Sequence, residues 1–219
     1  PSHCPARGRK VTVRNNYRLI LLLLVFTVAG CMATPQPPVM MYTLNPELEN
    51  ILTSDGQAAA SQSIIRIGRM SSAQALQRHD ILYISNGHQQ NSYANSKWID
   101  APAAMMQRLF QQAIEMSGEF SAVLAPASRA RPDLVLEGAL FDFSHHIENN
   151  GTSSGVIRLS VNLVDNRTKQ VIASKALSAS VPAREQNAES AVAALNDAAA
   201  SIVRQLLEWL NTELAKASV

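Results

Sequence analysis

The chain has 219 residues, of which 47% are hydrophobic, and it carries 19 basic and 17 acidic side chains. Five of the basic residues and none of the acidic ones lie in the first 30 residues, so the remainder has 14 basic and 17 acidic side chains, a formal net charge of −3. This balance lacks the basic surface with which nucleic-acid-binding proteins meet a phosphate backbone. The composition therefore argues against a nucleic-acid partner and fits one domain of ordinary size.

The N-terminal segment has the order of an export signal. Basic residues precede an uncharged stretch, residues 19–30, whose twelve residues are too few to cross a bilayer as a helix, which takes about 20. The stretch ends in V-A-G-C at Cys31, which resembles a bacterial lipobox. That resemblance implies cleavage of residues 1–30 as a lipoprotein signal peptide and acylation of Cys31. The alternative, a buried cysteine at the end of a core element, is disfavoured by the basic flank and the proline-rich segment that follows.

The two cysteines agree with this processing. Cys4 would leave with the signal and Cys31 would carry lipid, so no thiol remains for a disulfide or a cysteine-based metal site. Two or more acyl chains hold a protein stably on a membrane. Residues 31–41 are proline-rich, which favours an extended tether of roughly 30 Å. The sequence thus predicts a signal peptide, a tether and one domain over residues 42–219.

The first half of the domain is predicted to contain short strands and one helix. We expect strands at residues 40–44 and 63–68, with a loop or short helical turn between them. A third strand, residues 80–85, is predicted to pair with residues 90–93 through the Asn86-Gly87 turn, because Asn-Gly suits a tight hairpin.

A helix is predicted to follow this hairpin. Asp100 is expected to cap it, Pro102 falls in its first turn, and Gly118 ends it. The two methionines could form a soft lipid-facing patch, although helical spacing favours core packing. The side chains with inward spacing are Met105, Met106, Leu109, Phe110, Ala113 and Ile114.

The second half changes to the period of a sheet. Residues 134–145, 156–164 and 170–181 are predicted to form three successive antiparallel strands, because turn residues separate them. Apolar and polar residues alternate along 156–164, which predicts a sheet with one face in water. Residues 188–215 carry an apolar stripe at three-and-four spacing, as in an amphipathic helix that covers a sheet. The predicted fold class is α+β, with a mixed, largely antiparallel sheet packed against two main helices.

The sequence shows no pattern typical of catalysis or metal binding. His145 and His146 are adjacent on a strand, so they point to opposite faces and cannot chelate one ion together. We expect them at a solvated strand end. Glu137 and Asp142 differ in parity, so they are not expected to form an acid–base pair. No G-x-S-x-G, H-E-x-x-H or glycine-rich phosphate loop is present. We therefore predict no catalytic residue, no cofactor and no metal.

Residues 76–110 resemble the ABC-type transport auxiliary lipoprotein family. In that family a strand ending in Ile-x-Tyr is followed by a tyrosine, a basic residue directly before a tryptophan, and a proline that opens a helix. Residues 69–71 and 76–78 depart from the proline and the leucine-aspartate pair that the family often has before this strand. The matching residues here are Ile81, Tyr83, Tyr93, Lys97, Trp98 and Pro102.

The resemblance implies a periplasmic lipoprotein that works with an inner-membrane ABC or related transporter and an Mce-domain protein carrying lipid across the periplasm. Met32 follows Cys31, and the aspartate that commonly retains lipoproteins at the inner membrane is absent. An outer-membrane anchor is therefore favoured. The domain is expected to contact these partners. Phospholipid is a candidate ligand, and a homo-oligomer around the end of the partner is compatible with this role.

The hairpin and the following turn supply the expected contact residues. Tyr83, Tyr93 and Trp98 are predicted to contact a partner or lipid, because aromatic side chains are enriched where interfaces carry their energy. Lys97 is predicted to meet an acidic partner or a lipid phosphate. The alternative is that Trp98 fills the entrance of the helix and Tyr93 packs beside it. Two other functions remain open: a structural or assembly lipoprotein of the cell envelope without lipid contact, and an enzyme with an unrecognised site.

Overall fold

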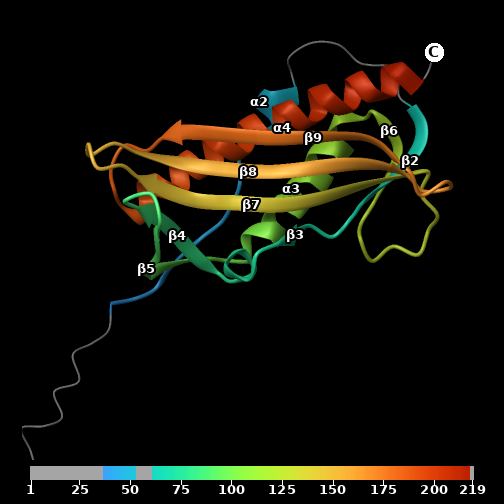
Figure 1. Ribbon diagram of the computed structural model, residues 1–219. Coiled ribbons are helices and arrows are strands. Elements are labelled where there is room, and N and C mark those ends of the chain that lie inside the picture. Colours follow the sequence, from blue (N-terminus) through green and yellow to red (C-terminus); the bar gives the residue numbers. More distant parts are fainter. Residues whose placement is uncertain (1–36, 53–60, 218–219) are drawn as a thin grey trace, which may run out of the picture. The chain divides into compact units, whose positions relative to one another are not determined.

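The computed structural model describes residues 37–52 and 61–217 (Figure 1). Cys31, the predicted signal peptide and most of the predicted tether lie outside the described residues. The unit Val39–Val219 contains the whole described core.

The long strand β7 (Leu134–Ile147) is the centre of a nine-stranded sheet. Along one edge it pairs antiparallel with β8 (Ser153–Asp165), which in turn pairs antiparallel with β9 (Val171–Pro182). We call this the continuous edge of β7, and it confirms the predicted three-stranded meander. The predicted alternation along β8 is also found, since its buried side chains include Ile157, Leu159, Val161 and Leu163.

The other edge of β7 is divided among three short strands that run parallel to it, and we call it the split edge. Those strands meet successive parts of β7; they are β2 (Ser61–Ile67), β3 (Ser71–Ser72) and β4 (Asp80–Ser85). Further strands extend the sheet; they are β6 (Phe120–Leu124) beside β2, β5 (Gln89–Trp98) beside β4, and β1 (Met40–Tyr42) beside β5. The sheet is thus mixed, as predicted, with its longest pairings antiparallel.

The hairpin β4–β5 turns at Asn86 and Gly87, as predicted. Both have positive φ values, 51° and 77°, a conformation that asparagine and glycine adopt with little strain. Strand β5 is longer than expected, because it continues to Trp98 and pairs with β1. Its register against β4 shifts between Asp80 and Leu82, so this hairpin is irregular at its base.

The predicted first main helix is α3 (Pro102–Ser117), and it ends at Gly118 in the left-handed conformation, φ 67°. All six of its inward residues are buried, including both methionines. The predicted cap at Asp100 is wrong: the N-cap residue is Ala101. The Asp100 carboxylate accepts a hydrogen bond from the Ala101 N–H and pairs with Arg108, so it stabilises the turn before the helix instead.

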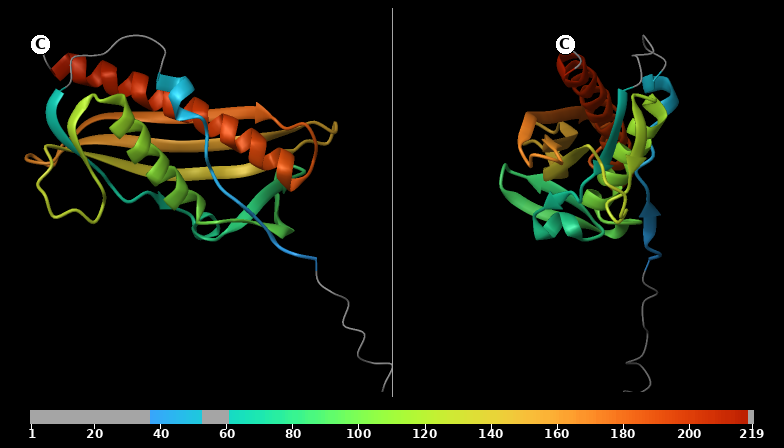
Figure 2. Two further views of the ribbon diagram at one scale, coloured as in Figure 1. Left: turned by 180° about the vertical axis from the view of Figure 1, so that it is seen from behind. Right: turned by 90° about the vertical axis from the view of Figure 1, so that its right-hand side faces the viewer.

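The last helix is α4 (Ala188–Ala217), and it lies with α3 on one face of the sheet (Figure 2). The turn predicted between the first strands contains a short helix, α2 (Leu48–Leu52), and a 3₁₀ turn η1 (Gln74–Gln77) precedes β4. The backbone of α4 comes very close to β8, because a Cβ atom on Gly155 would lie 2.7 Å from the Leu195 nitrogen. The two helices and the sheet enclose one hydrophobic core.

Candidate functional site

All four predicted contact residues of the domain lie on the β4–β5 hairpin. Tyr83 is on β4, and Tyr93, Lys97 and Trp98 are on β5. The structure separates them, because Trp98 enters the core whereas the other three remain partly exposed. The hairpin therefore contains a buried residue beneath a partly exposed group.

Trp98 is 0% exposed and packs edge-to-face on Phe143, with ring centroids 5.5 Å apart. Its backbone N–H donates to the His79 carbonyl, which fixes the end of β5 against the start of β4. Its indole N–H has no hydrogen-bond partner. The structure thus supports the core interpretation for Trp98, which offers no surface to a partner in this conformation.

Tyr83, Tyr93 and His145 form an aromatic cluster over the junction of β4, β5 and β7. The two tyrosine rings are 5.0 Å apart, and the Tyr93 hydroxyl lies 2.7 Å from Nδ1 of His145. Burial raises the pKa of Tyr93 to about 12. Tyr93 therefore both packs beside the core and keeps part of its ring at the surface.

His145 is completely buried, so its predicted place at a solvated strand end is wrong. The reason is tertiary: β4 pairs with β7 in a register that sets Tyr83 beside His145 and covers the ring. Burial, together with the nearby His146, lowers the pKa of His145, so the neutral ring is favoured. Its Nε2 atom is buried without a partner.

Lys97 forms an ion pair with Asp80, which also pairs with Arg78 at 3.0 Å. The hydrogen bond from Lys97 is the main reason that the pKa of Asp80 lies below its usual value. Two cations share one carboxylate, so this group keeps one excess positive charge. Arg78 is its most exposed member, with 72% of the side chain accessible.

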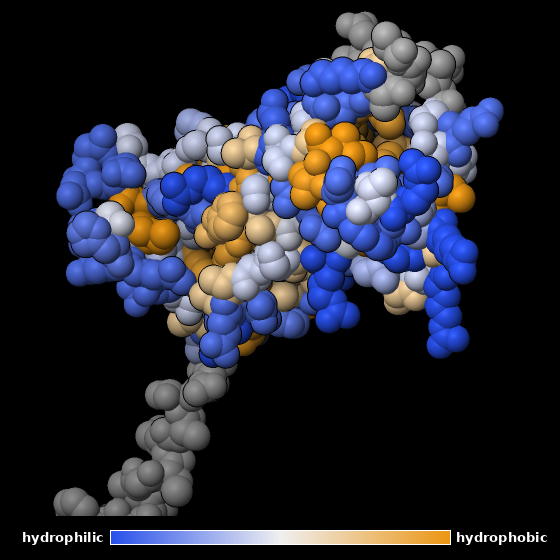
Figure 3. All heavy atoms as spheres, turned by 45° about the vertical axis from the view of Figure 1, so that its right-hand side comes forward, coloured by the Kyte–Doolittle hydropathy of each residue, from blue (hydrophilic) through white to orange (hydrophobic). Residues whose placement is uncertain are grey.

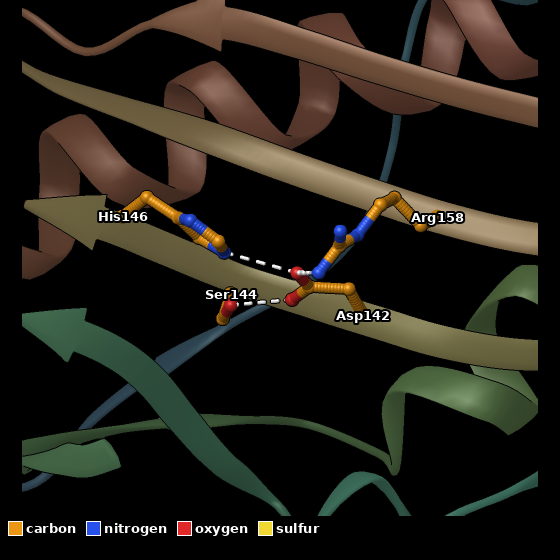
Figure 4. A network of polar contacts seen from close by, with 4 residues as sticks. All are labelled: Asp142, Ser144, His146 and Arg158. Carbon is orange, nitrogen blue, oxygen red and sulfur yellow. Dashed lines mark hydrogen bonds and ion pairs between the residues drawn. The ribbon is translucent and has the colours of Figure 1, made fainter. Parts of the chain in front are cut away.

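The opposite face of β7 carries a polar network around Asp142 (Figure 4). Its carboxylate, only 6% exposed, accepts hydrogen bonds from Ser144 at 2.5 Å and from His146 and Arg158 at 2.9 Å each. Burial alone raises the pKa of Asp142, but the hydrogen bonds from His146, Ser144 and Arg158 outweigh it and hold the pKa below its usual value. The charge of Asp142 is thus fully partnered.

A bulge in β7 places this network on one face. The register against β8 shifts between Leu140 and Asp142, so Phe141 is an extra residue. His146 lies on the face opposite to His145, as predicted. Its ring is hydrogen-bonded to Asp142, however, so the predicted place of His146 at a solvated strand end is wrong. The predicted difference in parity between Glu137 and Asp142 is wrong for the same reason, since the extra residue brings both to one face.

Aspartate, serine and histidine also occur together in hydrolases, but their geometry here is different. A nucleophilic serine gives its proton to the histidine, which the aspartate orients. Here the Ser144 hydroxyl donates to Asp142 instead, and Ser144 is 2% exposed. The three donors therefore stabilise the buried Asp142 carboxylate, and the geometry does not make Ser144 a nucleophile. In the sequence, this network is indicated by polar residues at every second position of β7, namely Asp142, Ser144 and His146.

Within residues 37–52 and 61–217, no group of three or more histidine, cysteine, aspartate and glutamate side chains could hold a metal ion. In the same residues, no helix is long and apolar enough to cross a membrane.

A surface hollow of about 720 Å³ lies between Ser61, Asp165 and Leu214, away from the hairpin. The face in Figure 3 shows separate hydrophobic areas among hydrophilic ones.

Comparison with known proteins gives a family match and structural relatives. The family model of the ABC-type transport auxiliary lipoprotein component matches residues 42–206. No curated protein matches the chain. Protein XCC0632 from Xanthomonas campestris is 19% identical, with a TM-score of 0.67 over 83% of this chain and 96% of that one. A crystal structure of an uncharacterized protein is 11% identical, with a TM-score of 0.60 over 80% and 99%. At these identities the structural likenesses support the fold alone.

Proposed function

Because the chain belongs to the ABC-type transport auxiliary lipoprotein family, we propose that it is a lipid-anchored periplasmic subunit at the outer membrane. In this role it assists an inner-membrane ABC or related transporter and an Mce-domain protein in moving lipid between the two membranes. The observation that carries the proposal is the family match over residues 42–206, which spans nearly the whole folded domain and follows the V-A-G-C motif.

The anchor is the first element of the proposed mechanism. Acylation at Cys31 attaches the chain to the bilayer through a tether of about ten residues, and two or more acyl chains make that attachment stable. The domain then stays at the membrane surface, where a partner that spans the periplasm would reach it.

The hairpin is the second element. Tyr83, Tyr93 and Lys97 are partly exposed and lie on paired strands. The two tyrosines can present aromatic groups to a partner, and Lys97 can present a positive charge to an acidic partner or a lipid phosphate. Trp98 contributes from inside the core, where its ring packs on Phe143 and holds the end of β5 in place. A homo-oligomer around the end of the partner is compatible with this arrangement.

Replacement of Cys31 tests the anchor. Cys31→Ser is expected to block acylation and cleavage, which leaves an uncut precursor without labelled palmitate. Cys4→Ser is the matched control, because that residue would leave with the signal peptide. Normal maturation of the Cys31→Ser chain with unchanged palmitate incorporation would refute the lipoprotein processing.

Photo-cross-linking tests the partner. A cross-linking amino acid is placed at Tyr83 in one chain and, as a control, at the exposed Val171 of β9 in another. We expect an Mce-type protein to be captured from Tyr83 and not from Val171, and mass spectrometry of the purified complex to detect phospholipid. Recovery of neither partner nor lipid would favour the structural or assembly role in the envelope.

A further inference from the structure

Four apolar side chains are strongly exposed around the edge strand β1. We call them the β1 patch; its members are Val39, Met40, Met41 and Ile99, and each is more than half exposed. Strand β1 is the end strand of the sheet path, and among the strands of the described residues it pairs only with β5. Such a concentration of large apolar side chains on a short edge usually marks a surface that something covers.

The register of β1 and β5 shows that most of the patch lies on one face. Met41 is paired with Lys97, and the Ile99 N–H donates to the Tyr42 carbonyl at 2.7 Å. Successive side chains of a strand alternate between faces. Because Trp98 and Tyr42 pack on the core, Met41, Lys97 and Ile99 point outward together.

The length of chain before the patch limits how far it can lie from the anchor. Eight peptide steps separate Cys31 from Val39, and a fully extended chain of that length spans at most about 29 Å. If Cys31 is acylated, as the proposed function requires, the patch is the first surface of the folded domain to follow the membrane anchor along the chain.

The charges beside the patch favour a lipid surface. Lys97 and Arg78 share the single carboxylate of Asp80, so one positive charge is in excess next to Met41. Asp100, which follows Ile99, is balanced by Arg108. Anionic headgroups attract basic side chains within a Debye length of the membrane.

We propose that the β1 patch rests on the bilayer, with its apolar side chains at the boundary between headgroups and acyl chains and Lys97 and Arg78 toward anionic phosphates. This inference rests on the proposed anchor at Cys31 and adds a second, non-covalent contact. A lipid tether alone leaves the domain free to rotate, whereas a second contact fixes its orientation. The β4–β5 hairpin would then face a partner at a defined angle to the membrane.

Single thiols can report on this contact. In the lipidated chain Cys4 has been removed and the Cys31 sulfur is alkylated, so an introduced cysteine is the only free thiol. Met41→Cys, Ile99→Cys and Val171→Cys are labelled with an environment-sensitive fluorophore. All three positions are more than half exposed, so the label leaves the core intact, and Val171 is the control on β9. The lipidated chains are placed in vesicles of phosphatidylethanolamine and phosphatidylglycerol, with and without brominated lipid.

We expect brominated lipid to quench the labels at positions 41 and 99 at least twofold more than the label at position 171. If the chains float with the vesicles but all three labels are quenched equally, the patch contact is refuted and the anchor stands. A blue shift in the emission of the label at position 41 without quenching would refute the contact with the bilayer. It would indicate instead that a second copy of the chain covers the patch. Failure to float would refute the anchor, and with it the patch contact.

Discussion

The two edges of β7 differ in how completely they satisfy buried polar groups. The continuous edge meets a single strand, β8, along nearly its whole length, while the split edge meets three short strands in turn. In the described part of the chain, the buried side-chain atoms without a hydrogen-bond partner lie on β7, on strands of the split-edge side or next to them. They are Arg66 Nε, Ser72 Oγ, Trp98 Nε1, Glu119 Oε2 and His145 Nε2.

This difference has a physical cause. A long antiparallel pair repeats one geometry, so its side chains alternate regularly between core and solvent. Each short strand on the split edge needs a turn and a new register, and these irregular junctions bury polar atoms that reach no partner. Such atoms cost free energy. The proposed contacts Tyr83, Tyr93 and Lys97 lie on the same side, which fits the rule that local departures from ideal packing gather at functional sites.

The strongest test of the continuous edge is Gly155→Ala. A Cβ atom there would lie 2.7 Å from the Leu195 nitrogen and 2.8 Å from the Ala194 carbonyl carbon, both in the backbone of α4. Because backbone atoms cannot swing aside, the helix must move off the sheet. We expect the free energy of unfolding, measured in urea, to fall by about 3 kcal/mol.

Gly138→Ala on β7 is the matched control for this prediction. There the nearest atom to the new Cβ is the terminal methyl carbon of Met70, at 3.0 Å, which can rotate away. We expect a change of less than about 1 kcal/mol. Equal losses for both variants would mean that close approach of α4 to β8 does not set the stability of the meander.

Asp142→Asn tests whether a buried charge on the continuous edge is stabilising because it is fully partnered. The amide cannot accept all three hydrogen bonds, so we expect a loss of about 2 kcal/mol at pH 7. The pKa of Asp142 is lowered in the folded chain, so its contribution is present above the unfolded pKa and is lost as the pH falls through the lower, folded pKa.

The measurement is the free energy of unfolding between pH 7 and pH 3. The parent chain should lose more stability than Asp142→Asn at the acid end of this range. Ser144→Ala, which removes one donor and keeps the carboxylate, should retain most of the acid dependence. Parallel pH curves for the parent chain and Asp142→Asn would contradict the assignment.

Sequence patterns predicted the features that depend on local order. The meander, the Asn86-Gly87 turn and the buried face of α3 follow from alternation, turn chemistry and helical spacing, and the structure confirms them. Strand β6 was not predicted, because its five residues lack a clear alternation and form a strand by pairing with β2.

The candidate site was less predictable, because it depends on contacts between distant segments. The burial of His145 follows from the pairing of β4 with β7, about 60 residues apart in sequence, and no local pattern contains that information. The bulge at Phe141 changes which residues share a face and was equally invisible. The family resemblance singled out Trp98 as a candidate contact. Its position in the core depends on packing against Phe143, which is distant in sequence, so the local pattern did not decide it.

Glu119→Gln tests the cost of an unpartnered atom on the split-edge side. Burial raises the pKa of Glu119 to about 7, although a hydrogen bond from Asn211 opposes this shift. The folded chain therefore holds this proton more tightly than the unfolded chain. Its stability should fall as the pH rises from about 4.5 to 7 and then level off.

The neutral amide removes this titration. We expect Glu119→Gln to be more stable than the parent chain by about 2 kcal/mol at pH 8 and to differ little at pH 5. Thermal unfolding at both pH values measures the difference. A variant that is less stable than the parent at pH 8 would mean that the ionised carboxylate has partners and that the split edge is better satisfied than the hydrogen bonds indicate.

The smallest expected effect separates the two tyrosines of the hairpin. Tyr93→Phe removes the 2.7 Å hydrogen bond to His145 and leaves that buried ring without a partner on either nitrogen, so we expect a loss of about 1 kcal/mol. Tyr83→Phe keeps the ring contact with Tyr93 and is expected to change stability by less than about 0.5 kcal/mol. If only Tyr93→Phe destabilises the chain while both variants weaken cross-linking to the partner, Tyr83 acts in contact alone and Tyr93 acts in both roles. Equal stability losses would instead mean that the hydrogen bond to His145 contributes nothing and that the split edge is held by ring packing.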